Sequence, residues 1–243
     1  MKTKIYISIT LLFISSFSIA QKFKTSIMLS PGISYLSSSN PKVVTRSVMI
    51  KNRGYKFCFS GTIREEYYFP RIFSLGIGLE YLNASGNFSS PAPMVSPIPE
   101  ISASYLHYLS VQSLDIPLFL RLRTNKDMTK EIYLFCGAGM SYIFQTNRAI
   151  DMITSYDYSP STKDISFVTK GTITMKTQNN NQTGTFGLLG FGKIFAIKKL
   201  TFFCEAKYRF DFNKWNYPTV NDPVNITFDI KRQCFLLSLG ITF

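Results

Sequence analysis

The stretch Leu200-Thr201-Phe202-Phe203-Cys204-Glu205-Ala206-Lys207-Tyr208-Arg209-Phe210-Asp211-Phe212 decides the fold class of this 243-residue chain. Its even positions carry apolar or small side chains, whereas the odd positions from 205 to 211 carry Glu, Lys, Arg and Asp. Alternate residues of an extended strand point to opposite faces. The stretch therefore predicts a β-strand with one aromatic-rich face and one face with charges of both signs.

Neither face of this strand suits a water-soluble sheet. A Phe-rich face exposed to water invites aggregation, and a charged face inside a sealed apolar core costs several kcal/mol per ion. A closed barrel with lipid outside and a polar interior satisfies both faces. A lipid-facing Lys or Arg costs roughly 2–4 kcal/mol at the membrane midplane. The apolar faces of 23–35, 73–82, 200–212 and 235–243 contain neither residue.

Other segments share the alternating pattern, and together they predict about eight strands. They are 23–35, 55–69, 73–82, 113–123, 131–144, 185–197 and 234–243. Three features do not fit simply: the phase upstream of Ser113 is unclear, the glycine-rich 185–197 has no assignable faces, and Glu65 interrupts an apolar face, as a bulge would. Short connections alternate with long ones, as the periplasmic turns and extracellular loops of outer-membrane barrels do. The sequence predicts an all-β, closed, antiparallel up-and-down transmembrane β-barrel.

The first twenty residues have the layout of a secretory signal peptide. Lys2 and Lys4 precede the apolar stretch 5–14, and Ser18-Ile19-Ala20 places small residues where a signal peptidase reads them. The alternative, a membrane anchor, needs roughly 20 apolar residues. We expect a signal peptide over 1–20 and one barrel domain over 21–243. Removal of both lysines lowers the net charge from +13 to about +11.

Cysteine spacing and charge exclude several classes of function. Cys58, Cys136, Cys204 and Cys234 lie far apart without a Cys-x-x-Cys pair, so we expect no metal and no cofactor. The stretch 40–56 holds five Lys or Arg and no acid. It is interpreted either as a contact for lipopolysaccharide phosphates or as a solvated loop. Nucleic acid is not an expected partner, because an exported chain meets lipid phosphate first.

Short motifs resemble a known family. The segment 235–243, FLLSLGITF, resembles the terminal strand of outer-membrane proteins, and Phe243 is similar to the signal read by the barrel-assembly machinery. Leu114-Asp115-Ile116-Pro117-Leu118 resembles the L-x-I-P-L strand of the PorT-type outer-membrane β-barrel family. Tyr133 with Gly137-Ala138-Gly139, then Gly190-Phe191-Gly192, continues the pattern in order. The resemblance implies a small barrel in the outer membrane of a Gram-negative bacterium, without implying one activity.

The charged positions of the polar faces form a predicted lumenal network. Its members are Arg64, Glu66, Glu80, Glu205, Lys207, Arg209 and Asp211. The interior of an eight-stranded barrel is just wide enough for its own side chains, so these groups should pair and fill it. Only a larger strand count would favour a channel. Trp215 and Tyr217 follow a strand end, where an interfacial aromatic girdle is expected.

The expected function is a non-enzymatic outer-membrane barrel whose long extracellular loops bind a partner or surface ligand. Its other expected partners are outer-membrane lipid, including lipopolysaccharide, and the assembly machinery. The alternatives are a component of an envelope secretion or assembly complex, a narrow pore, and a hydrolase or acyltransferase at the barrel rim. Because His107 is the single histidine, no catalytic constellation can be read. The loop 145–182 is expected to contain a hairpin near 165–175, and 84–104 is expected to be irregular.

Overall fold

The computed structural model describes residues 23–39, 51–52, 54–69, 73–91, 101–124, 130–156, 169–178, 181–197, 200–218 and 227–243. The expected signal peptide and most of the basic stretch 40–56 lie outside these residues. No helix in the described part of the chain is long and apolar enough to cross a membrane.

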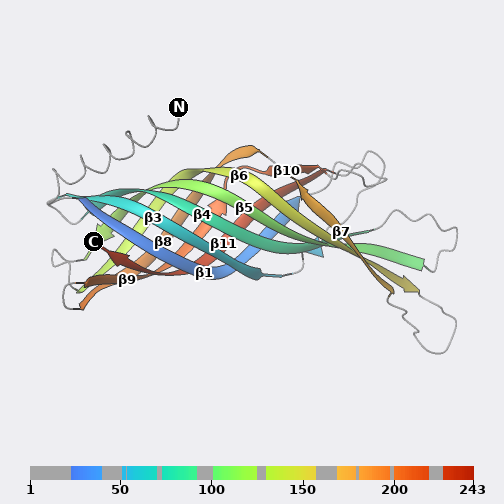
Figure 1. The fold of residues 1–243 in the computed structure, drawn as a ribbon, viewed down its shortest axis with the longest axis horizontal. Coiled ribbons are helices and arrows are strands. Elements are labelled where there is room, and N and C mark those ends of the chain that lie inside the picture. The colour runs from blue at the N-terminus through green and yellow to red at the C-terminus, as the bar shows by residue number, and fades with distance from the viewer. Residues whose placement is uncertain are drawn as a thin grey trace, which may run out of the picture.

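Eight strands form a closed ring in which each strand is antiparallel to its neighbours. The ring order is β1 (Phe23–Ser39), β3 (Lys56–Tyr68), β4 (Phe73–Pro91), β5 (Ile101–Arg123), β6 (Lys130–Tyr156), β8 (Gln182–Ile197), β9 (Leu200–Asp211) and β11 (Thr227–Thr242). Pairing of β1 with β11 closes the barrel (Figure 1). The predicted eight-stranded antiparallel barrel is confirmed.

Three shorter strands extend the ring at one end. They are β2 (Lys51–Asn52), β7 (Thr169–Gln178) and β10 (Trp215–Pro218), which pair with β4, β6 and β11 respectively. The opposite end holds the short connections, such as the one between β8 and β9 (Figure 1). We call these the loop end and the turn end.

The outer wall is apolar between two belts of aromatic rings. At the turn end, Phe23 packs on Tyr67, Phe69 on Phe73, and Phe195 on Phe202. Towards the loop end, Tyr35 packs on Tyr55, Phe59 on Tyr81, and Tyr81 on Phe144. At roughly 3.3 Å per residue and a tilt of about 40°, the span from Phe23 to Tyr35 covers about 30 Å, close to the apolar band of membrane barrels.

Above the second belt, the inside and outside of the barrel exchange their polarity. Leu82 and Leu109 are buried inside the barrel there. On the outside, Ser110 donates a hydrogen bond to Asn83 at 2.7 Å, and Tyr81 donates one to Gln112 at 3.1 Å. The strands therefore continue beyond the apolar band with the alternation of a water-soluble barrel.

This exchange corrects two expectations. Much of the segment 84–104 is not irregular, because β4 continues to Pro91 and β5 begins at Ile101. The unclear phase upstream of Ser113 has the same origin, together with a register shift between β5 and β6 at Gln112/Ser113. On β5 itself the odd positions still face inward, but there they are Leu109 and Val111 rather than charged groups.

The structure also bears on two smaller predictions, a hairpin near 165–175 and a bulge at Glu65. Part of the hairpin expected near 165–175 is β7, which pairs with the distal part of β6, whereas 165–168 lie outside the described residues. No bulge occurs at Glu65, since its register with Thr25 and with Ile77 is uninterrupted. Instead, the Thr25 hydroxyl donates a hydrogen bond to the Glu65 carboxylate at 2.9 Å.

Candidate functional site

The charged face of β9 lies in the lumen and reaches across it. All seven residues of the predicted lumenal network are inside the barrel, and none is more than 5% exposed. The four contributed by β9 each contact a different part of the wall. β9 therefore acts as the hub of the lumenal contacts.

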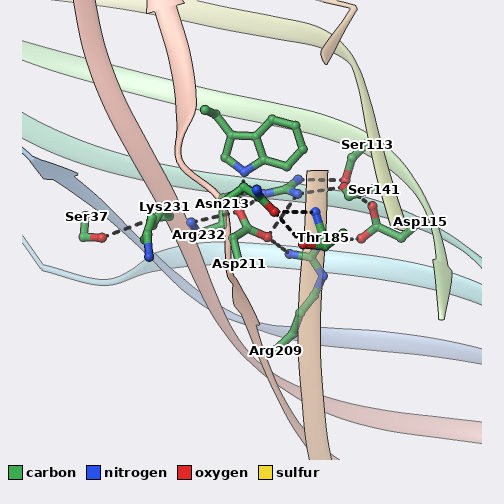
Figure 2. Close-up of polar contacts among 11 residues, drawn as sticks. Ser37, Ser113, Asp115, Ser141, Thr185, Arg209, Asp211, Asn213, Lys231 and Arg232 are labelled. Carbon is green, nitrogen blue, oxygen red and sulfur yellow. Dashed lines mark hydrogen bonds and ion pairs between the residues drawn. The ribbon is translucent and has the colours of Figure 1, made fainter. Parts of the chain in front are cut away.

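Nearest the loop end, five side chains form a closed circuit that we call the upper ring (Figure 2). Its members are Asp115, Ser141, Arg209, Asp211 and Arg232. Arg209 contacts Asp115 at 2.8 Å and Asp211 at 3.0 Å, and Arg232 donates from Nε to Asp211 at 2.8 Å. Arg232 also donates to the Ser141 hydroxyl at 2.8 Å, and Ser141 donates in turn to Asp115. The circuit ties β9 and β11 to β5 and β6 across the lumen.

Two further layers lie closer to the turn end. Lys207 donates to Glu80 of β4 at 2.6 Å and forms the middle pair. Below it, the lower cluster consists of Arg64, Glu66, Arg121, Tyr133 and Glu205. Glu205 pairs with Arg64 at 2.6 Å and with Arg121 at 3.3 Å, and it accepts a hydrogen bond from Tyr133 at 2.6 Å. Arg121 also pairs with Glu66 at 3.1 Å.

Each of these three layers has as many cationic as anionic groups. The upper ring has two arginines and two aspartates, the middle pair one of each sign, and the lower cluster two arginines and two glutamates. An unpaired buried charge carries a desolvation penalty of several kcal/mol, so local neutrality is what a closed lumen requires. The three layers of ion pairs therefore connect strands on opposite sides of the lumen.

The four arginines of these layers also stack on aromatic rings. Arg64 lies over Phe203, Arg121 over Tyr133, Arg209 over Phe186 and Arg232 over Trp215, at 3.9–5.0 Å from the guanidinium carbon to the ring centroid. Each ring in turn covers a glycine of the wall, where a Cβ would come within 2.6 Å of the ring. These glycines are Gly240, Gly192, Gly139 and Gly184, in the same order. Guanidinium groups stack well on aromatic faces, and glycine leaves the room that the ring needs.

The remaining lumen is filled by apolar side chains rather than by a water column. Met28, Phe119, Phe135 and Leu188 belong to one buried cluster, and a second cluster on β3, β4 and β11 includes Cys58 and Cys234. The cavity between Lys207, Glu80 and Glu205 has a volume of about 20 Å³, room for about one water molecule. The lumen is therefore less polar than predicted. Its packing supports a barrel that is closed to solutes.

Several residues of these layers are not predicted by the sequence pattern. Asp115 and Arg121 lie on the recognised polar face of their strand, but nothing in the alternation marks them as partners of β9. Arg232 precedes the segment 234–243 that was expected as the last strand, whereas β11 begins at Thr227. Its place in phase with Cys234 and Leu236 was the available signal.

The interfacial girdle expected at Trp215 is wrong for that residue. Trp215 is only 5% exposed, and its indole donates to Asp211 at 2.5 Å inside the barrel. The requirement of the indole N–H for a buried acceptor, together with the space above Gly184, holds the ring inward. The side chain of Tyr217 lies outside the described residues. Phe243 is 70% exposed, and its amide donates to the carbonyl of Thr25 at 2.9 Å.

The described residues contain no group of three or more His, Cys, Asp or Glu placed to hold a metal ion. All four cysteines are free, with Cys58 and Cys234 buried and Cys136 and Cys204 exposed on the outer wall. His107 lies on the inner face of β5 and is 1% exposed.

Three solved structures illustrate the similarity of this fold to known barrels. OprG from Pseudomonas aeruginosa is 11% identical, with 90% of this chain and 95% of that chain covered and a TM-score of 0.45. The outer membrane protease OmpT from Escherichia coli is 9% identical, with coverages of 92% and 96% and a TM-score of 0.45. Neisserial surface protein A (NspA) is 13% identical, with coverages of 90% and 97% and a TM-score of 0.37. No curated protein matches the chain.

The family comparison covers most of the barrel. Residues 19–217 match the model of the outer membrane protein beta-barrel domain. That family places the protein in the outer membrane of a Gram-negative bacterium. In bacterial outer-membrane barrels the short turns face the periplasm and the longer loops face outward, and this rule assigns the turn end to the periplasmic side. The chain belongs to the outer membrane protein beta-barrel domain family.

Proposed function

We propose that this protein is a non-enzymatic outer-membrane barrel that binds a partner or surface ligand through its extracellular end. The observation that carries the proposal is the length of β5, β6 and β7. β6 alone has 27 residues, whereas about 9–11 residues of a tilted strand cross the membrane. The surplus builds a sheet that projects from the barrel (Figure 1).

The edge of this projecting sheet has a form that suits recognition. β7 pairs with β6 along one side. Among the described strands, none pairs with its other side. An open strand edge presents backbone donors and acceptors to which an extended segment of another protein can add. We infer that β7 is the docking edge for such a segment.

The lumen supports a binding role over a transport role. Three neutral layers of ion pairs and two apolar clusters fill the space that a solute would need. We also propose that, within its family, the chain is one of the PorT-type barrels. The Leu114–Leu118 motif supports this narrower placement.

A photo-crosslinking amino acid at Lys170 or Thr172 of β7 tests the docking edge in intact cells. We expect a discrete crosslinked product from one of these positions, while the same probe at Leu118, on the lipid-facing wall, gives none. The Thr172→Pro variant, probed at Lys170, should lose that product because proline removes a backbone donor and blocks strand addition. Its migration on gels before and after heating should stay unchanged, because β7 lies outside the ring of eight. Equal crosslinking from Leu118 and Lys170, or full crosslinking in Thr172→Pro, would reject the docking edge.

A further inference from the structure

An apolar groove of about 490 Å³ lies on the outer wall near the turn end. Its sides come from four adjacent strands: β1, β8, β9 and β11. Its lining includes Ile27, Leu29, Phe195, Phe202, Leu239 and Ile241. A volume in this range is typical of sites that hold a small molecule, and this one has walls without charge.

The floor of the groove includes the strand backbone around Gly240. Met28 and Phe203, which face the lumen and are nearly fully buried, also line the groove. Gly240 pairs with both of them in the sheet register, and a side chain there would point into the lumen, where the Phe203 ring lies. On the outer surface, the groove lies between outward side chains, of which Ile27, Leu29 and Leu239 are exposed.

The side chain of Lys193 places a positive charge beside this groove. Lys193 is exposed on the outer face of β8, two residues from Phe195 and directly opposite Cys204 of β9. It is the only Lys or Arg that the described strands point outward between the two aromatic belts. Within the described residues, no carboxylate forms an ion pair with it. A lysine in the lipid-facing wall is costly unless its ammonium reaches the interface and an anion.

We propose that the groove holds one acyl chain of a phospholipid from the periplasmic leaflet and that Lys193 binds its phosphate. The position fixes the leaflet, since the groove contains Phe195 and Phe202 of the turn-end belt. The charge fixes the head group, because an ammonium at this depth requires an anionic oxygen. A chain seated in a groove makes contacts on three sides, whereas lipid on the rest of the convex wall makes contacts on one. This lipid is a bound ligand rather than bulk solvent.

Native mass spectrometry tests the site in the full-length barrel. The protein is refolded into vesicles of phosphatidylethanolamine and phosphatidylglycerol and then transferred to a mild detergent. We expect one retained phospholipid per wild-type barrel. Ile241→Trp, which fills the groove, should lose it. Lys193→Gln should weaken retention roughly tenfold, the scale of one charge-assisted contact, and Lys193→Arg should restore it.

Leu118→Trp is the matched control, because Leu118 is 51% exposed on the outer wall of β5, away from the groove. It should retain lipid as the wild type does. Heat-modifiable migration shows that each variant is folded. Equal retention in Ile241→Trp and wild type, detergent alone in the groove, or no retained phospholipid in the wild type would each overturn the proposal. None of these outcomes bears on the docking edge of β7.

Discussion

Arg209 is the residue on which the upper ring depends most. It pairs with both Asp115 and Asp211, so Arg209→Met leaves the buried Asp115 carboxylate without a cation, while Asp211 keeps Arg232. Removing one partner of a buried pair costs about 3–5 kcal/mol. We expect a loss of that size in the free energy of unfolding, measured by urea titration of the barrel in vesicles.

Lys214→Met is the control for this measurement. Lys214 approaches Asp229 at 3.9 Å, but its side chain is half exposed. Exposed ion pairs contribute about 0–1 kcal/mol, so the variant should unfold with the wild type. If the Arg209→Met barrel were as stable as the Lys214→Met barrel, the upper ring would not contribute to the stability of the barrel.

The glycines beneath the lumenal rings make a second prediction. A Cβ at Gly139 would lie 2.5 Å from both the Ile116 carbonyl and the Phe186 ring. Gly139→Ala should therefore destabilise the barrel by about 1–3 kcal/mol, as overpacking does. At Gly61 the nearest atom to a new Cβ is 3.8 Å away, in Leu29, so Gly61→Ala should be neutral. Thermal loss of the compact form on gels compares the two, and similar behaviour would contradict the close packing.

At the scale of residues, the sequence predicts which side chains face the lumen, but not which residues they contact there. Alternation along β9 places Glu205, Lys207, Arg209 and Asp211 on one face, and local pattern is sufficient for that. Their partners lie on β3, β4, β5 and β11, and strand period carries no information about contacts across the lumen. Trp215 was misplaced for the same reason, because its acceptor Asp211 and its glycine are fixed by tertiary register.

Individual strands change environment along their length, and β5 shows where. Leu118 lies on the outer wall between the aromatic belts, and Ser110 lies outside above them. Leu118→Arg should cost roughly 2–4 kcal/mol on insertion, and Ser110→Arg at most about 1 kcal/mol. Folding yields into vesicles over a urea series measure the difference. If the two variants fold equally well, the upper belt is not the membrane boundary.

The same change of environment limits how well the bounds and faces of the strands can be predicted from the sequence. A strand rule based on lipid outside and charge inside is valid only within the apolar band. Beyond it, Leu82 and Val111 turn inward and Asn83 turns outward, so the rule ended the strands too early. The glycine-rich β8 had no readable faces because three of its inner positions are glycines. Gly190 and Gly192 are covered by rings from β6, and Gly184 is covered by Trp215 of β10.

The whole molecule is expected to be closed to ions. The cavity at the middle pair has room for about one water molecule, and each of the three layers described above is neutral. In planar bilayers the wild-type barrel should add no steady conductance steps. A 16-stranded porin, whose wide lumen holds water, is the positive control. Reproducible steps from the wild type would revive the narrow-pore alternative.

Strand number and barrel closure were predictable from the sequence because they rest on repeated patterns and on the alternation of short and long connections. The projecting sheet of β5, β6 and β7 was only partly predictable, since its residues alternate in the opposite sense. The groove at Gly240 was not predictable. It depends on which outward side chains of β1, β8, β9 and β11 the strand register brings side by side.

The reach of the β9 side chains has a consequence for how such barrels diversify. Duplication of a hairpin is a simple genetic route to a larger circumference, and the diameter grows with each added strand. A glutamate or lysine of fixed length could not then touch the far wall, and the buried ions would lose their counterions. The contacts across the lumen therefore restrict proteins that evolve from this gene to eight strands.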